Sequence, residues 1–91
     1  MSQVTNETNS ANYSTMDLSA IAWVIRRDWK KVYFGAVPYL DAMGDLCNIN
    51  DRYGYDSGVS IVLYFLANAN TWRGPIAREI KKELNKRCKG A

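Results

Sequence analysis

The chain has 91 residues, enough for one domain, and twelve basic against nine acidic side chains give it a formal net charge of +3. It has no histidine, so the commonest general base and the commonest metal ligand are both missing. It also lacks a Gly-rich phosphate loop, a Cys-x-x-Cys pair and a Gly-x-Ser-x-Gly motif. These absences disfavour the common classes of enzyme and metalloprotein.

The N-terminal segment MSQVTNETNSANYSTM is rich in Ser, Thr and Asn and almost devoid of large apolar side chains. We therefore predict a disordered tail over residues 1–13 and a single helical domain over residues 14–91. The longest apolar run, IVLYFLA, is far shorter than the roughly 20 residues that cross a bilayer, and the N-terminus does not resemble a signal peptide. We expect a cytoplasmic protein without membrane contact, in which Cys47 and Cys88 are buried or idle thiols rather than a disulfide.

The first helix is predicted from STMDLSAIAWVIRRDW. Ser14 and Asp17 have the spacing of a capping box, in which each side chain satisfies an early backbone N–H group. Residues at helical spacing then form one apolar face: Leu18, Ile21, Ala22, Ile25 and Trp29. Trp23 falls elsewhere on this helix, where the apolar face does not require it.

A second helix is predicted with Pro38 in its first turn, because proline disfavours the α region for the preceding Val37. Its apolar face would consist of Ala36, Leu40, Met43 and Cys47. The following segment, NINDRYGYDSG, is typical of a connector, with room for a short helical turn over residues 51–53 and a positive φ at Gly54. Asp56 or Ser57 is expected to cap the next helix.

The third helix, GVSIVLYFLANAN, is apolar on nearly all sides, which is typical of a buried helix. The fourth, PIAREIKKELNKRCK, has a narrow apolar stripe and a possible Glu83–Arg87 pair at i,i+4 spacing. Together the elements predict an all-α fold: a compact bundle of about four helices with a central apolar third helix. Dimerisation would stabilise so small a core, so a homodimer is possible.

The turn ANANTWRGP between the last two helices is dense in polar and special residues. We expect Asn68 and Asn70 to bond the backbone where the third helix ends, and Trp72 to cover the end of the core. Gly74 would permit the turn and Pro75 would begin the fourth helix. Arg73 either caps carbonyl groups of the third helix or contacts a partner, and the sequence leaves that choice open.

Candidate chemistry is sparse. Asp41 and Asp45 lie one helical turn apart, but such a pair is usually a solvated face, and a Mg²⁺ or Ca²⁺ site draws more oxygen ligands from several segments. No nucleophile and base occur in a recognisable arrangement. We therefore predict no catalytic residue, no metal and no cofactor.

Basic and aromatic side chains are the remaining candidates. RRDWKK (residues 26–31) has four basic side chains and one acidic one, and residues 73–91 have seven and two. Exposed Trp, Tyr and Arg are the residues that anchor protein interfaces, and basic side chains contact phosphates. The predicted partner-binding residues are Trp23, Arg26, Arg27, Lys30, Tyr33, Arg73, Arg78, Lys81 and Lys82. For the aromatic members of this group, a place in the core is an open alternative.

Three segments, DWKKVYFGAVPYLDAM, YGYDSG and YFLANANTWRGPIAREIKKEL, resemble a family of small uncharacterised helical proteins encoded by bacteriophages and prophages. The resemblance covers most of residues 17–84. It implies a mobile-element origin and a role in the cytoplasm of the host cell, and it carries no catalytic or binding residue with it. As a class, small phage proteins of this size resemble inhibitors that block host machinery.

Two hypotheses follow. The first is a non-enzymatic phage-type binding protein that occupies a surface of a macromolecular partner and inhibits a host or defence protein. The alternative is a small basic DNA- or RNA-binding protein that uses the C-terminal helix and RRDWKK. Glu79 and Glu83 interrupt the basic sequence, and a net charge of +3 is weak for a nucleic-acid binder.

Overall fold

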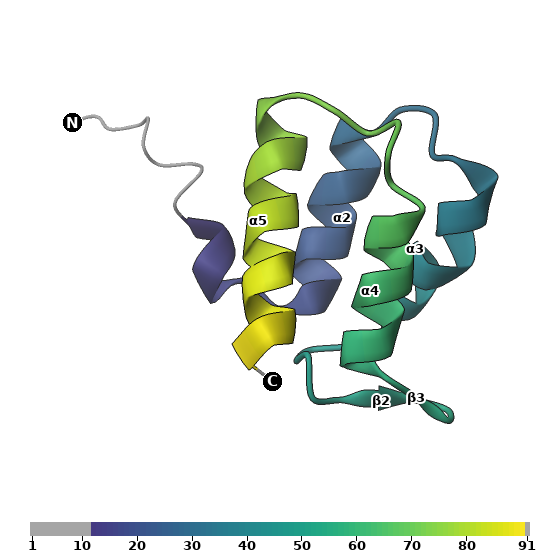
Figure 1. Cartoon of the computed structure of the whole chain (residues 1–91), viewed down its shortest axis with the longest axis vertical. Helices are drawn as coiled ribbons and strands as arrows, with labels where there is room; N and C mark the ends of the chain where they lie inside the picture. The colour runs from purple at the N-terminus through teal and green to yellow at the C-terminus, as the bar shows by residue number, and fades with distance from the viewer. Residues whose placement is uncertain (1–11, 91) are drawn as a thin grey trace.

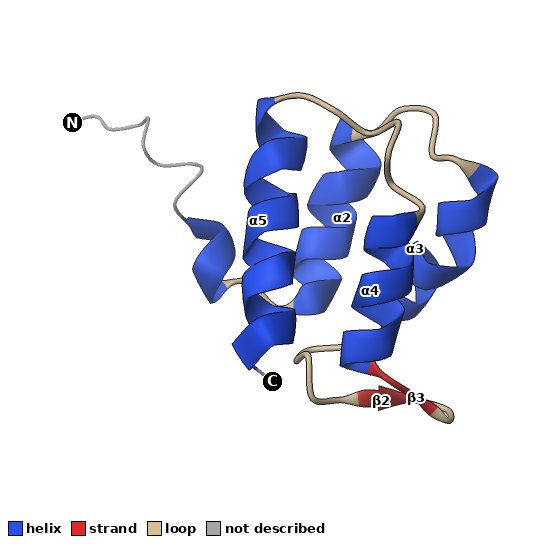
Figure 2. Ribbon diagram, viewed as in Figure 1, coloured by secondary structure: helices blue, strands red, loops and turns tan. Residues whose placement is uncertain are grey.

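The computed structural model describes residues 12–90, which fold into four α-helices and a small hairpin (Figures 1 and 2). The α-helices are α2 (Leu18–Asp28), α3 (Val37–Met43), α4 (Gly58–Ala67) and α5 (Pro75–Gly90). Short 3₁₀ helices precede α2 and α3: η1 (Asn12–Thr15) and η2 (Phe34–Ala36). The predicted compact four-helix fold is confirmed. No helix within the described range is long and apolar enough to span a bilayer.

The predicted tail falls mostly on residues 1–11, which lie outside the described part of the chain. Its last two residues belong to η1. Tyr13 packs partly buried against the core, and its carbonyl accepts a hydrogen bond from Arg87 Nη2 at 2.8 Å. This contact between η1 and α5 joins residues 74 positions apart. The folded part of the chain therefore begins before residue 14.

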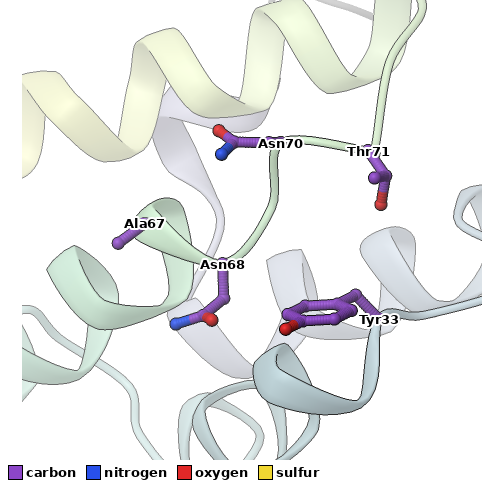
Figure 3. Close-up of a pocket in the computed structure, with 5 residues that line it drawn as sticks. All are labelled: Tyr33, Ala67, Asn68, Asn70 and Thr71. Carbon is purple, nitrogen blue, oxygen red and sulfur yellow. The ribbon is translucent and has the colours of Figure 1, made fainter.

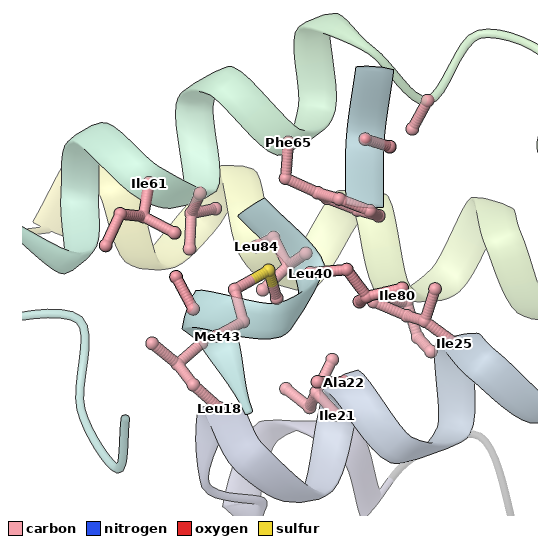
Figure 4. Packing of buried hydrophobic residues seen from close by; sticks show 14 of the residues in the cluster. Leu18, Ile21, Ala22, Ile25, Leu40, Met43, Ile61, Phe65, Ile80 and Leu84 are labelled. Carbon is pink, nitrogen blue, oxygen red and sulfur yellow. The ribbon is translucent and has the colours of Figure 1, made fainter. Parts of the chain in front are cut away.

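The core lies between the four helices, each of which contributes one apolar face (Figure 4). The predicted face of α2 is confirmed, since Leu18, Ile21, Ala22, Ile25 and Trp29 are all buried. The helices pack in a ring, in which α2 and α4 each contact α3 and α5. In this arrangement every helix has two helical neighbours and one side toward solvent.

The start of α2 differs from the prediction. Its N-cap is Asp17, and the Asp17 side chain makes no capping hydrogen bond, so the capping box is wrong. The N–H groups of Leu18 and Ser19 instead donate to the carbonyls of Cys47 and Leu46, each at 2.9 Å. Backbone from the segment after α3 thus satisfies the first amides of α2, and no side-chain cap is needed.

Helix α3 has Pro38 in its first turn, as predicted. Val37 nevertheless adopts the α region, with φ −56° and ψ −49°, because it continues from η2 directly into α3. The helix ends at Met43, so Cys47 lies beyond it and is exposed rather than on its apolar face.

The connector forms a hairpin, and the predicted helical turn over residues 51–53 is wrong. Strand β2 (Arg52–Tyr53) pairs antiparallel with β3 (Asp56–Ser57), and Gly54 takes the expected positive φ of 64° in the turn between them. The Asp51 carboxylate accepts from the N–H groups of Cys47 and Asn48, each at 3.0 Å. These two bonds hold the pKa of Asp51 below its usual value.

Helix α4 begins as predicted and is less buried than predicted. Ser57 is its N-cap, and Ser57 Oγ accepts from the Ser60 N–H at 3.1 Å. Ile61 and Phe65 point into the core, but Leu63 and Tyr64 are 48% and 53% exposed. The expectation that this helix is buried on nearly all sides is therefore wrong, because the ring of helices leaves its outer side uncovered.

Candidate binding surfaces

The turn between α4 and α5 is built largely as its sequence predicts. Asn68 Nδ2 donates to the Tyr64 carbonyl at 2.9 Å, Gly74 has a φ of 115°, and Pro75 is the first residue of α5. Trp72 is 2% exposed and closes this end of the core. Its ring stacks on Trp29 at a centroid distance of 5.9 Å.

Arg73 and Lys81 bond the carbonyl groups of this turn. Arg73 Nε donates to the Asn70 carbonyl at 3.3 Å, so Arg73 caps the turn rather than α4 itself. Lys81 Nζ donates to the carbonyls of Ala69 and Trp72 at 2.8 and 2.7 Å. Burial and the charge of Arg73 lower the pKa of Lys81. The sequence placed Lys81 among partner contacts, and no local signal indicated its role within the fold.

The predicted contacts on α2 lie on its outer side. Trp23 is 58% exposed, and the Arg27 guanidinium lies over its ring, 4.7 Å from the centroid. Arg26 forms an ion pair with Asp41 of α3, so it links two helices. Lys30 is exposed in the segment after α2.

The outer side of α5 is basic. Arg78 and Lys82 are exposed, as are Lys86 and Lys89, and their spacing of four, four and three residues places them on one side of the helix. We call these four residues the basic stripe. Glu83 lies on a different side, where its carboxylate pairs with Arg87 Nε at 2.7 Å, as the sequence predicted. Glu83 therefore does not interrupt the basic stripe, whereas the exposed Glu79, three residues before Lys82 and seven before Lys86, lies on the same side of the helix.

Four exposed aromatic or apolar side chains and the half-buried Tyr39 lie on the segment before α3, on α3 and on the outer side of α4. We call this group the aromatic surface, and its residues are Tyr33, Phe34, Tyr39, Leu63 and Tyr64. Phe34 is 80% exposed, and its ring lies 4.8 Å from that of Tyr33. Tyr39 and Tyr64 are in contact across α3 and α4, with ring centroids 5.4 Å apart.

Gly35 and Asn68 join the two halves of the aromatic surface. A Cβ on Gly35 would lie 2.5 Å from Tyr33 Cε2 and 2.9 Å from Asn68 Oδ1, so both side chains pack against bare backbone here. Asn68 in turn bonds the carbonyl of Tyr64. A pocket of about 270 Å³ opens beside them, lined by Tyr33, Ala67, Asn68, Asn70 and Thr71 (Figure 3).

Only Tyr33 of the aromatic surface was among the predicted binding residues. Leu63 and Tyr64 were assigned to a buried helix, and Phe34 was not singled out. The one available signal is that GVSIVLYFLA has no charged residue and is apolar on nearly all sides, which indicates either full burial or an uncovered apolar side.

Residues 12–90 contain no cluster of three His, Cys, Asp or Glu side chains that could hold a metal ion. Cys47 and Cys88 are free thiols, and burial raises the pKa of Cys88. Cys47 is exposed, so of the two expected alternatives, a buried or an idle thiol, it is not the buried one.

The nine predicted binding residues thus fall on three regions: the outer side of α2, the aromatic surface, and the start of α5 with its outer side. The Asp28 carboxylate accepts from Trp72 Nε1 at 2.8 Å, which ties the end of α2 to the turn before α5.

The chain matches no known protein family, no curated protein and no solved structure.

Proposed function

We propose that the protein is a non-enzymatic binding protein that acts by occupying a surface of a macromolecular partner. The observation that carries the proposal is the aromatic surface, where Tyr33, Phe34, Leu63 and Tyr64 remain between 43% and 80% exposed in a domain whose other apolar residues are mostly buried. A group of exposed apolar side chains on a small domain is a feature of interaction sites.

The composition of this surface suits a protein partner. Large aromatic side chains dominate the binding energy of protein interfaces, and they cluster at the centre of the contact. Tyr33 and Asn68 are held in place by their packing on Gly35, so they lose little freedom on binding. Trp23 with Arg27, on the outer side of α2, is a separate proposed contact of the same chemical kind.

The proposed partner is a host or defence protein, and the proposed effect is inhibition by occupancy. The resemblance of three segments to phage and prophage proteins supports this choice. The mode of action requires no catalytic group: it requires a stable surface that covers a functional surface on the partner.

A pull-down from bacterial lysate tests the proposal. The wild-type protein is expected to retain one protein at a stoichiometric level, and the double variant Phe34→Ser, Leu63→Ser is expected to weaken the interaction by about thirtyfold or more, the usual effect of truncating a central apolar contact. Both side chains are substantially exposed, so the variant should fold normally.

Tyr55→Ala is the matched control, because Tyr55 is 99% exposed on the hairpin, outside the aromatic surface. This variant should bind as the wild type does. Failure to retain any stoichiometric partner, or equal binding by the double variant, would contradict the proposal. Light scattering adds a further check: a wild-type dimer that becomes a monomer in the double variant would make the aromatic surface a homodimer interface instead.

The second candidate function is DNA or RNA binding through the basic stripe of α5. It is favoured by one observation, that Arg78, Lys82, Lys86 and Lys89 share a side of the helix that Glu83 does not reach. Four phosphate contacts predict a plot of log affinity against log salt with a slope of about −3 to −4 on duplex DNA.

A gel shift over a salt series measures this slope. The double variant Lys82→Gln, Lys86→Gln should reduce it by about two, because each phosphate contact contributes nearly one counterion. Binding that is absent at low salt, or that does not depend on salt, would exclude the nucleic-acid function.

A further inference from the structure

A second pocket, of about 300 Å³, lies where the turn from α4 enters α5. The turn passes over one end of the helical ring and α5 starts directly below it (Figure 1). The pocket is lined by Trp72, Arg73, Gly74, Ala77, Arg78 and Lys81. Half of these residues are cationic and none is acidic. It shares no residue with the aromatic surface.

None of the three cations of the pocket forms an ion pair within the described residues. The ion pairs of the described residues join Arg26 to Asp41 and Glu83 to Arg87, and neither involves a cation of the pocket. The Asp28 carboxylate accepts a hydrogen bond from the indole N–H of Trp72, and it forms no ion pair with a cation of the pocket within the described residues. Burial and, to a smaller extent, the neighbouring charge of Arg73 lower the pKa of Lys81.

The pocket also has unused hydrogen-bond donors. Lys81 gives two of its three N–H groups to the carbonyls of Ala69 and Trp72. Arg73 uses only Nε, and the Arg78 guanidinium makes no hydrogen bond within the described residues. These charged groups can each donate a further hydrogen bond to an anion in the pocket.

The start of α5 adds to the positive electrostatic potential in this pocket. Its first hydrogen bond runs from the Arg78 N–H to the Gly74 carbonyl at 3.0 Å, and glycine at this position has no side chain to cap the first amides. Pro75 has no N–H group, so the amides of Ile76 and Ala77 are the ones without a partner in the helix. The positive end of the helix dipole therefore coincides with the cationic pocket.

We propose that this pocket is a phosphate-binding site in which Arg73, Arg78 and Lys81 contact the phosphate oxygens. Three cationic donors around one small pocket match the charge and the multiple acceptors of a phosphate group. The site goes beyond the proposed function, since it lies apart from the aromatic surface and its ligand is an anion.

The test is an NMR titration of the ¹⁵N-labelled chain with potassium phosphate against potassium chloride at matched ionic strength. Phosphate is expected to shift the amide signals of Gly74, Ile76, Ala77 and Arg78 saturably, and chloride is not. The double variant Arg73→Gln, Arg78→Gln should weaken phosphate binding about tenfold or more, because two charge-assisted hydrogen bonds are lost. Lys81 is left intact because the fold uses it.

Lys82→Gln is the matched control, since Lys82 is an exposed cation on the same helix and does not line this pocket. It should bind phosphate as the wild type does. Equal weakening by Lys82→Gln, or shifts of the same size at Lys86 and Lys89, would show non-specific attraction and overturn the proposal, as would a lack of saturation.

Oligonucleotides with and without a 5′-phosphate identify the source of the group. If only the 5′-phosphorylated oligonucleotide shifts the amide signals of the pocket, the ligand group is a phosphomonoester. If both oligonucleotides shift these signals equally, the ligand group is the phosphodiester backbone. The proposal is overturned if neither free phosphate nor a bound oligonucleotide shifts these amide signals. This result leaves the pull-down on the aromatic surface unchanged, so the two proposals fail separately.

Discussion

Lys81 and Lys82 are adjacent in the sequence and have the same side chain, but successive residues of a helix point in different directions, so the two lysines lie in different environments. Lys81 turns toward the end of α4 and bonds the carbonyls of Ala69 and Trp72, whereas Lys82 is exposed on the basic stripe. Helices leave their last carbonyls without partners, so a cation from another helix can satisfy them. Lys81 therefore acts as a cap supplied by α5 to the turn after α4.

Lys81→Met should lower the free energy of unfolding by about 1–3 kcal/mol, because the partly buried carbonyls of Ala69 and Trp72 lose a charged donor. Lys82→Met is the same substitution at an exposed site, and its free energy of unfolding should stay within about 0.5 kcal/mol of the wild-type value. Urea unfolding followed by tryptophan fluorescence measures both. Equal losses in the two variants would mean that Lys81 does not cap this turn.

At the scale of the element, the hairpin shows how close backbone contact determines a local structure. Gly58 begins α4, and a Cβ at this position would lie 2.5 Å from the Ile49 carbonyl oxygen. The connector before β2 therefore passes directly against the first turn of α4. Residues 51–53 extend into β2 because they pair with β3, a contact that their own helical tendency does not provide.

Gly58→Ala should destabilise the protein by about 1–3 kcal/mol, because the clash is with backbone that cannot rotate away. The substitution is expected to be destabilising even though alanine favours a helix over glycine by about 1 kcal/mol. Gly90→Ala in α5 is the control, since no atom lies within 4 Å of its added Cβ, and it should be neutral or slightly stabilising. Thermal unfolding by circular dichroism separates the two; a stable Gly58→Ala variant would disprove the close contact.

At the scale of the whole molecule, the aromatic side chains divide into two populations. Trp29, Phe65 and Trp72 pack on one another at one end of the core, with ring centroids 5.9 to 6.3 Å apart. The aromatic surface and Trp23 remain exposed. In so small a domain this division separates residues that hold the helices together from residues available to a partner.

Trp72→Ala should cost about 3–5 kcal/mol and leave little folded protein, because it empties the end of the core and removes the partner of Asp28. Trp23→Ala removes the same side chain from an exposed site where only the Arg27 contact is lost, and should cost about 1 kcal/mol or less. Chemical denaturation measures both. A large loss of unfolding free energy in Trp23→Ala would mean that Trp23 stabilises the fold and is not part of a binding surface.

The sequence by itself determined the four helices, the buried face of α2, a cap for α4 at Asp56 or Ser57, and most of the turn before α5. Each of these depends on residues within a few positions of one another, through helical spacing or the conformations of glycine and proline. The Glu83–Arg87 pair was predictable for the same reason, since i,i+4 neighbours meet on any helix.

Only the tertiary structure decided which polar groups find partners and which apolar groups stay uncovered. The first amides of α2 bond carbonyls almost 30 residues away, and Lys81 bonds carbonyls 9 and 12 residues away. The aromatic surface exists because the ring of helices leaves the outer side of α4 open. The cationic pocket has the same origin: its charges come from one short turn and one helix start, and the packing of the helices leaves them without an ion pair within the described residues.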